Sequence, residues 1–328
     1  MKQSLTFDNL KLNFVFNNKN MAKCLVTGGA GFIGSNLVDR LIQAGDEVVV
    51  VDNLYSGKKE YLNPKAKFYN LDIRSEEVKE VFQAEKFEFV FHLAAQIDAR
   101  YSVRDPLFDL DINVKGGLNI LENCRETGVK KIIFASTGGA LYGDDVSQIP
   151  TPESVEPGPV TPYGIHKLSF EKYLNYSKQV FGQDYIALRF ANVYGPRQYK
   201  GGESGVISIF IDKAVSGETG TINGSGKQTR DYVYVDDVVF AFLKARESDF
   251  SGELNLGSSE ETSVLELVEK IEAALGEKMA IEHAPEPPGD QKRSCLDAGR
   301  AREILDWEPQ ISLEEGIKKT LAWTREIK

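Results

Sequence analysis

The sequence has 328 residues, of which 41% are hydrophobic and 27% are charged, so it is long enough to bury a sizeable core in one large domain or two closely associated ones. A formal net charge of −10 argues against nucleic acid or an anionic membrane as the main partner. The cysteines Cys24, Cys124 and Cys295 show no C-x-x-C spacing, and no histidines pair at metal-ligand spacing. We therefore expect a reducing compartment and no catalytic metal.

The first 20 residues hold no long apolar run, and they lack the charged start and the small-residue cleavage site of a signal peptide. Because Met21-Ala22-Lys23 is a natural start for the fold inferred below, we interpret residues 1–21 as a flexible N-terminal extension. No stretch is apolar enough to span a membrane, so we expect a cytoplasmic protein.

A glycine-rich stretch follows, in which an apolar run turns directly into an amphipathic segment. Its glycines, Gly28, Gly31 and Gly34, have the spacing G-x-x-G-x-x-G. The first allows a sharp turn, the second lets the backbone approach a pyrophosphate, and the third lets helix and strand pack closely, while the helix N-terminus offers N–H groups to phosphate. The stretch predicts a dinucleotide-binding turn; the alternative is a phosphate-binding turn of another kind.

A second apolar run, Glu47-Val48-Val49-Val50-Val51, ends in Asp52, about twenty residues beyond the turn, where a carboxylate hydrogen-bonds an adenosine ribose. No arginine stands in Asp52-Asn53-Leu54-Tyr55 to accommodate a 2′-phosphate. The pattern therefore predicts NAD as the cofactor in preference to NADP.

Apolar runs and amphipathic segments alternate as far as Phe190, which predicts a doubly wound parallel α/β sheet of the Rossmann type. Further strands are expected at 67–71, 89–93, 131–135 and 184–190, and helices at 77–82, 105–128 and from Thr161-Pro162 onward. Beyond Ala191 we expect short strands at 233–235 and 254–256 and helices at 207–215, 238–245, 264–275 and 313–323. We therefore divide the chain into a dinucleotide-binding domain over residues 22–191 and a smaller mixed α/β substrate domain over 192–328. This division allows segments beyond residue 192 to return to the dinucleotide-binding domain.

Tyr163 and Lys167 lie four residues apart, on one face of the helix expected after Thr161. A positive charge beside a phenol favours the phenolate, which makes Tyr163 a candidate general base. The spacing alone is weak, because Tyr55/Lys59 and Tyr61/Lys65 share it, but those pairs lie in a loop. Tyr163 and Lys167 instead lie in a helix that follows, after one loop, a strand ending in Ser and Thr residues. This context favours a catalytic role.

Eight motifs of the sequence can be considered together. They are the glycine turn, Asp52-Asn53, Asp72-Ile73, His92-Leu93-Ala94-Ala95-Gln96, Asn113, Tyr163-x-x-x-Lys167, the run from Leu188 to Arg197 and the run from Arg230 to Asp237. Together they resemble the extended short-chain dehydrogenase/reductase family and, within it, the UDP-glucose 4-epimerase group. The similarity extends from Met21 to Trp323. Its motifs are specific for the family and less specific for the sugar.

The resemblance implies a hydride shuttle on tightly held NAD that inverts C4 of a UDP-hexose, with UDP-glucose/UDP-galactose and UDP-GlcNAc/UDP-GalNAc as substrates. Tyr163 would take the proton of the 4-hydroxyl, and a transient 4-keto sugar would rotate before hydride returns to its other face. The resemblance adds to the cofactor site the residues Phe32, Ile33, Asn53, Leu54, Ser56, Gly57, Asp72, Ile73, Leu93, Ala94, Ala95, Gln96, Asn113, Tyr163 and Lys167.

The sequence departs from the family pattern at Gly138, the position at which members carry a Ser or Thr that hydrogen-bonds the sugar 4-oxygen. Losing one such donor costs on the order of a hundredfold in rate. Thr137 is our first candidate for the missing hydroxyl, as a catalytic and substrate-binding residue, and Ser136 is the second. Gly138-Gly139-Ala140 also offers no acid of the kind that the dehydratases and decarboxylases of the family carry here, which leaves epimerisation.

At the substrate end, the resemblance suggests that Asn192, Arg230 and Arg293 hold the UDP diphosphate and nearby groups; the alternative for the arginines is ordinary surface salt-bridging. Asp290 and Ser294 in the same segment are also candidate substrate contacts. Ser294 falls where the family limits the room near the sugar C2 substituent, and a small serine resembles members that admit N-acetylated sugars. Asn223 replaces an aromatic residue that is common before Gly224-Ser225-Gly226, a departure that concerns the contacts to the base.

Two other functions share these features. A relative that epimerises a UDP-hexuronic acid such as UDP-glucuronate, or a UDP-pentose, would have the same catalytic residues and a different pocket lining. An NAD-binding regulator would keep the fold without the chemistry. The family resemblance also suggests a homodimer built from the helices that contain Asn113 and Tyr163.

Overall fold

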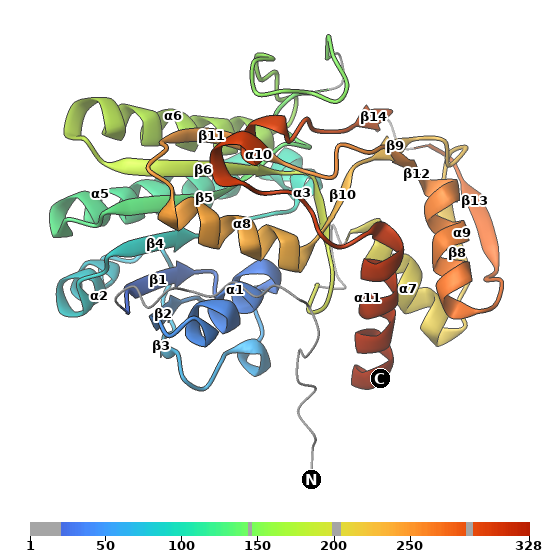
Figure 1. Cartoon of the computed structure of the whole chain (residues 1–328), viewed down its shortest axis with the longest axis horizontal. Coiled ribbons are helices and arrows are strands. Elements are labelled where there is room, and N and C mark those ends of the chain that lie inside the picture. The colour runs from blue at the N-terminus through green and yellow to red at the C-terminus, as the bar shows by residue number, and fades with distance from the viewer. Residues whose placement is uncertain (1–20, 144–145, 199–204, 287–290) are drawn as a thin grey trace.

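We describe a computed structural model of the chain over residues 21–143, 146–198, 205–286 and 291–328 (Figure 1). Seven parallel strands form the central sheet, in the spatial order β11-β6-β5-β4-β1-β2-β3. Their bounds are β1 Lys23–Thr27, β2 Glu47–Val51, β3 Lys67–Tyr69, β4 Phe89–His92, β5 Lys131–Thr137, β6 Asp184–Phe190 and β11 Gly252–Leu256. The doubly wound Rossmann-type fold expected from the sequence is confirmed. The extension over residues 1–20 lies outside the described residues.

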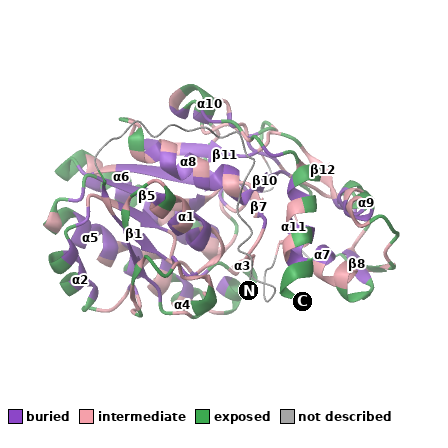
Figure 2. Ribbon diagram, turned by 60° about the horizontal axis from the view of Figure 1, so that its bottom comes forward, coloured by how far each residue is buried: buried purple, intermediate pink, exposed green. Residues whose placement is uncertain are grey.

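Helices cover both faces of this sheet, which explains why its strands are continuous apolar runs and not alternating ones (Figure 2). On one face, α1 (Phe32–Gln43) and α8 (Val235–Glu247) bury Leu37, Leu41 and Phe242 against the strands. The other face carries α2 (Val78–Glu85), α5 (Gly117–Thr127) and α6 (Pro162–Phe181), whose inward residues include Phe82 and Phe170. The result is one apolar core on each face of the sheet.

The central strand β1 lies between β2 and β4, so the chain leaves it in opposite directions on its two sides. In such sheets the crevice at the carboxyl ends of the strands, beside this reversal, is where ligands bind. The glycine turn, Asp52 and the loop that begins at Leu93 all follow carboxyl ends of these three strands. The topology therefore brings the predicted cofactor residues to one edge of the sheet.

The segment expected as one helix from Asp105 to Gly128 is divided. It consists of α4 (Pro106–Leu110), a π-turn η2 (Asp111–Gly116) and α5, preceded by a short helix α3 (Ala99–Arg104) that the sequence did not suggest. Asp105 caps the start, as its side chain accepts a hydrogen bond from Phe108 N at 3.0 Å. A π-turn keeps the chain helical, and apolar periodicity over so few residues does not distinguish it from an α-turn.

The chain beyond Ala191 contains three small sheets and further helices, most of which lie beside the carboxyl edge of the main sheet (Figure 1). The sheets pair β10 with β7, β12 with β9 and β14, and β13 with β8. The strands are β7 Asn192–Tyr194, β8 Gly220–Asn223, β9 Thr229–Arg230, β10 Tyr232–Tyr234, β12 Thr262–Ser263, β13 Ile281–Ala284 and β14 Arg293–Ser294. The helices are α7 Val206–Ser216, α9 Val264–Leu275, α10 Gly299–Leu305 and α11 Leu313–Ile327, and a short 3-10 turn η1 Lys59–Tyr61 lies earlier in the chain.

Two elements of this part of the chain pair with or pack on the main sheet. Strand β11 pairs with β6 at its edge, and α8 packs against α1, β5 and β6. The chain therefore leaves the main sheet after β6 and returns to it before the last small strands and helices form.

Candidate active site

The glycine turn joins β1 to α1 at the centre of the sheet. Gly28 has a left-handed φ of +72°, and a Cβ on it would lie 2.7 Å from Ala94 N. A Cβ on Gly34 would lie 2.1 Å from Gly28 O, so the helix can lie this close to the strand only without a side chain there. No acidic residue stands in the first turn of α1, so its N–H groups and the positive end of the helix dipole suit an anion.

Asp52 follows β2 and is buried beside this turn. Its Oδ2 accepts a hydrogen bond from Ala30 N at 3.0 Å, and its Oδ1 accepts one from Leu54 N at 2.8 Å. Burial raises the pKa of this carboxyl, and the two backbone donors oppose the rise. A Cβ on Gly57 would lie 3.0 Å from Asp52 Oδ1. Leu54 and Gly57 therefore shape the position of Asp52.

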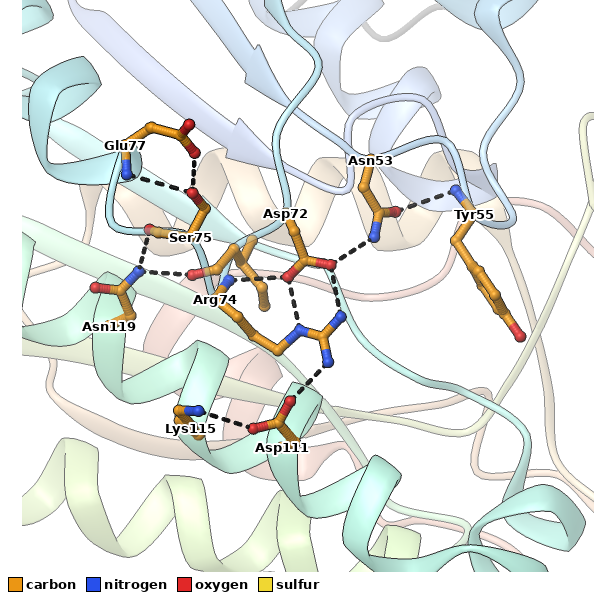
Figure 3. Close-up of polar contacts among 10 residues, drawn as sticks. Asn53, Tyr55, Asp72, Arg74, Ser75, Glu77, Asp111, Lys115 and Asn119 are labelled. Carbon is orange, nitrogen blue, oxygen red and sulfur yellow. Dashed lines mark hydrogen bonds and ion pairs between the residues drawn. The ribbon is translucent and has the colours of Figure 1, made fainter.

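Asp72 lies in a network of charges and amides after β3 (Figure 3). Arg74 donates to it through Nε at 2.8 Å and Nη2 at 2.9 Å, and through Nη1 to Asp111 at 2.6 Å. Asn53 donates to the same carboxylate at 2.8 Å. Hydrogen bonding by Arg74 lowers the pKa of Asp72 to about 2, so the carboxylate stays ionised. The sequence reasoning missed Arg74, although its place two residues after Asp72 was a usable signal.

A cavity of about 790 Å³ opens at this edge of the sheet. Its lining includes sixteen of the predicted cofactor residues, namely Gly28, Gly31, Phe32, Ile33, Gly34, Asp52, Asn53, Ser56, Asp72, Ile73, Leu93, Ala94, Ala95, Gln96, Tyr163 and Lys167. Leu54, Gly57 and Asn113 are not among the lining residues.

Asn113 instead supports the loop after β4. Its Nδ2 donates to Gln96 O at 2.9 Å, and its Oδ1 accepts from Gln96 N at 3.0 Å. Both ends of the amide are thus used to hold the backbone of one lining residue. In the described structure Asn113 acts on the cavity through Gln96.

The start of α6 fixes Tyr163 at the cavity. Thr161 caps the helix by accepting a hydrogen bond from Gly164 N at 3.2 Å, and Pro162 occupies the first turn, as the sequence predicted. Tyr163 N, which has no partner within the helix, donates to Ser102 Oγ of α3 at 3.1 Å. The phenol is therefore carried by a helix start that is anchored on both sides.

Lys167 lies one turn further along α6 and is almost wholly buried. Its Nζ donates to Ala135 O at 2.9 Å, lies 4.7 Å from the centre of the Phe134 ring and 5.8 Å from that of Tyr163. Burial lowers the pKa of this ammonium to about 8. The group is held beside the phenol, charged at neutral pH and without bulk water around it.

The two hydroxyls at the end of β5 differ in what they are bonded to. Ser136 Oγ donates to the buried carboxylate of Glu171 at 2.5 Å, in a cluster with Arg189. Thr137 Oγ1 accepts from Ala140 N at 3.3 Å, which leaves its proton available to a further acceptor. Ser136 lines the cavity and Thr137 does not. The hydroxyl at the cavity wall, that of Ser136, therefore already donates its proton to Glu171.

Gly138 is constrained by a side chain from the C-terminal third. A Cβ on it would lie 2.3 Å from Leu296 Cδ1 and within 3.1 Å of two further atoms of that side chain. Its backbone N donates to Phe190 O at 2.7 Å, so the turn cannot easily move away. The space that a Ser or Thr would occupy here is filled by buried Leu296.

Arg230, Arg293 and Ser294 come together on the small sheet of β9, β12 and β14. In the parallel pairing of β9 with β14, Arg230 is the register partner of Ser294, and Thr229 that of Arg293. A Cβ on Gly139 would lie 4.0 Å from Ser294 Oγ, so this sheet adjoins the turn that follows β5.

Asp231 joins these residues to Asn192. Its carbonyl accepts from Asn192 Nδ2 at 3.1 Å, and its N donates to Ser294 O at 2.9 Å. Its buried carboxylate accepts from Ser258 N at 2.8 Å and Leu296 N at 3.2 Å. None of the predicted substrate residues Asn192, Arg230, Arg293 and Ser294 lines the 790 Å³ cavity, and Asp290 lies outside the described residues.

Arg293 already has a carboxylate partner. Its Nε donates to Glu261 Oε1 at 2.9 Å and its Nη2 to Glu261 Oε2, a two-pronged ion pair on the surface. The structure therefore contains the salt bridge that the sequence offered as the alternative for this arginine. An anion bound by Arg293 would have to compete with Glu261.

The described part of the chain contains no group of three or more residues that could hold a metal ion. Its three cysteines are buried and unpaired. Among its helices none has both the length and the hydropathy to cross a membrane.

Comparisons with known proteins agree with this geometry. The NAD dependent epimerase/dehydratase family matches residues 24–257. A UDP-glucose 4-epimerase of Mycolicibacterium smegmatis is 43% identical over 309 residues, which cover 92% of this chain and 98% of that protein.

Two solved structures are also similar. A UDP-glucose 4-epimerase of Thermotoga maritima, determined with UDP-glucose, is 47% identical with a TM-score of 0.92, covering 93% of this chain and 99% of that one. A UDP-N-acetylglucosamine 4-epimerase of Methanobrevibacter ruminantium, in complex with UDP-N-acetylmuramic acid, is 33% identical with a TM-score of 0.90, covering 94% and 100%.

These matches confirm the family resemblance, the dependence on NAD and the enzyme class that the motifs had suggested. The cavity at the glycine turn is lined by Asp52, Tyr163 and Lys167 together, so three of the motifs found in the sequence meet there. The chain belongs to the NAD-dependent epimerase/dehydratase family.

Proposed function

We propose that this chain interconverts the C4 epimers of a UDP-hexose, acting on UDP-glucose/UDP-galactose and on UDP-GlcNAc/UDP-GalNAc. The observation that carries the proposal is the position of Tyr163 and Lys167 on the wall of the cavity that the glycine turn and Asp52 also line. The UDP-glucose bound in the Thermotoga structure and the UDP-N-acetylmuramic acid bound in the Methanobrevibacter structure support the nucleotide-sugar class.

The residues of the cavity fit NAD. Gly31, which lines the cavity, would let the pyrophosphate approach the first turn of α1, and Asp52 would offer carboxylate lone pairs to the ribose hydroxyls. Asn53 and Asp72 would lie beside the adenosine. NAD supplies a hydride acceptor that returns the same hydride, so the reaction has no net redox change.

The protein moves the proton. The phenol of Tyr163 accepts the proton of the sugar 4-hydroxyl and later returns it, and the ammonium of Lys167 stabilises the phenolate in between. We assign the hydrogen bond to the 4-oxygen to Thr137, because the proton of Ser136 is held by Glu171. The turn carries no acid for elimination or decarboxylation, which supports epimerisation as the outcome.

We further propose that the enzyme is a cytoplasmic homodimer. Exposed apolar side chains gather on α6 and on α3 and α4, which pack against it; they are Val103, Leu107, Leu110, Ile165, Tyr173, Tyr176 and Val180. We call this set the α6 surface. An exposed apolar patch of this kind is typical of a surface that a second subunit covers.

Replacing Tyr163 by Phe removes the proton acceptor and keeps the ring. NAD should stay bound while interconversion of UDP-glucose and UDP-galactose falls by at least about a hundredfold. Turnover is measured by resolving the C4 epimers of a panel of UDP-sugars incubated without added NAD. Near-normal turnover in this variant would exclude Tyr163 as the base, and a panel in which only UDP-glucuronate or a UDP-pentose is converted would favour those substrates instead.

Glu261→Gln should strengthen substrate binding, because it removes the charge that competes for Arg293 while keeping an acceptor for Thr229. We expect KM for the UDP-sugar to fall about two- to fivefold, the range of an exposed ion pair, with kcat unchanged. Arg293→Ala should raise KM, and adding Glu261→Gln to it should change nothing more. An unaltered KM in Arg293→Ala would remove this arginine from the diphosphate site.

Ser294→Tyr fills space next to Gly139, at the end of the sheet that adjoins the turn after β5. The variant should lose activity on UDP-GlcNAc and retain it on UDP-glucose, measured as the ratio of the two kcat/KM values. The wild type should convert both at comparable rates. A ratio that does not change would remove Ser294 from the specificity argument.

Sedimentation velocity should give a dimer for the wild type at micromolar concentration. Introducing a charge into the α6 surface by Tyr176→Glu with Val180→Glu should yield a monomer, because a buried carboxylate without a partner is costly at an interface. Ile327→Glu, an exposed apolar position on α11 away from this surface, serves as the control and should remain dimeric. A monomeric wild type would contradict the proposal.

A further inference from the structure

Asp109 is a fully buried carboxylate that no motif pointed to. It lies on α4, and its Oδ1 is 2.5 Å from His166 Nδ1 while its Oδ2 accepts from Gln96 Nε2 at 2.6 Å. A buried carboxylate is stable only when donors and charge compensate it. Here both donors come from elements of the active site and not from its own helix.

The two donors come from different elements of the site. His166 precedes Lys167 on α6, the helix that carries the phenol and the ammonium. Gln96 lines the cavity in the loop after β4, and Asn113 holds its backbone. Asp109 therefore ties the helix with the proton-transfer residues to the loop on the cofactor side.

The charge of the same carboxylate also acts on the ammonium of Lys167, one residue after the His166 to which Asp109 is bonded. In the described part of the chain, the titratable and charged groups that act on that ammonium include Asp109 on α4, Tyr163 and Glu171 on α6, and His92 on β4. His166, the residue before Lys167, is bonded to Asp109. Burial lowers the pKa of His92 to about 3, so its ring is uncharged at neutral pH. Glu171 is paired with Arg189 through bonds of 2.6 and 3.1 Å, which compensates its charge locally.

Burial lowers the pKa of Lys167, and the negative charges of Asp109 and Glu171 oppose this effect. Of these two charges, that of Asp109 contributes more. A buried ammonium with its pKa at about 8 has little margin at neutral pH. Any loss of negative charge nearby would leave part of the enzyme with an uncharged Lys167.

We propose that Asp109 is a positioning residue of the active site: it fixes α6 against the cofactor loop through His166 and Gln96, and its charge keeps the Lys167 ammonium protonated at neutral pH. The inference rests on the proposed role of Tyr163 and Lys167 in the epimerisation. It extends that role, because the charge state of Lys167 then depends on a residue in a different helix.

The test compares Asp109→Asn with Asp105→Asn in the NAD-loaded enzyme. Both remove one negative charge from the same short region, and asparagine keeps the cap that Asp105 provides for α4. The pKa of Lys167 is read by NMR from the 13Cε signal of labelled lysine, assigned through Lys167→Arg. kcat for UDP-galactose is measured from pH 6 to 9.5.

In Asp109→Asn we expect the pKa of Lys167 to fall by about one unit and the alkaline limb of kcat to move down with it. Turnover should then be about tenfold below wild type near pH 8.5 and close to it near pH 6.5, since one unit is a tenfold change in the protonated fraction. Asp105→Asn should match the wild type in both readouts. A merely structural role would lower kcat evenly at all pH values, and that result, or an unmoved Lys167 pKa, would overturn the proposal.

Two further outcomes separate this inference from the proposed function. A lower Lys167 pKa with an unmoved alkaline limb would support the electrostatic role of Asp109 and contradict the role of Lys167 in catalysis. If Asp109→Asn does not fold, Asp109→Asn with His166→Gln replaces both partners by neutral amides, a change that buried pairs tolerate better than the loss of one member. The same shifts are expected in it, and their absence would overturn the proposal equally.

Discussion

The ammonium of Lys167 is a charge without bulk water, and the surrounding structure has to supply what water would. Ala135 O accepts one hydrogen bond, the Phe134 and Tyr163 rings present their faces, and two carboxylates contribute negative charge. These groups come from β5, α6 and α4, so the charge is stable only when three elements are correctly placed. Because Tyr163 lies one helical turn before Lys167 on α6, the same contacts also place its phenol.

Local chemistry made much of the fold predictable, and it made the residues that line the candidate cavity recognisable in the sequence. The glycine spacing, the carboxylate after β2 and the Thr161-Pro162 helix start each act within a few residues, and each lies where the sequence indicated. The strand over 184–190 and the helix over 264–275 were predicted to the residue, because caps and apolar periods define their ends.

What the sequence could not provide is long-range in origin. The contact of Asp109 with His166 spans 57 residues, and the bonds of Arg74 to Asp111 span 37. The π-turn over 111–116 coincides with the amide of Asn113 that holds Gln96, a contact no periodicity encodes. Hydroxyl roles at Ser136 and Thr137 likewise depend on Glu171, which the motifs do not single out. Such residues become visible only when the elements are packed together.

The contact between Gly138 and Leu296 joins the end of β5 to a segment more than 150 residues later. The side chains at these two positions compete for the same space, so a hydroxyl-bearing residue can enter the turn only if Leu296 shifts or is replaced by a smaller residue. Grafting a hydroxyl-bearing turn onto this chain would therefore disturb the packing of Leu296 unless position 296 is changed with it.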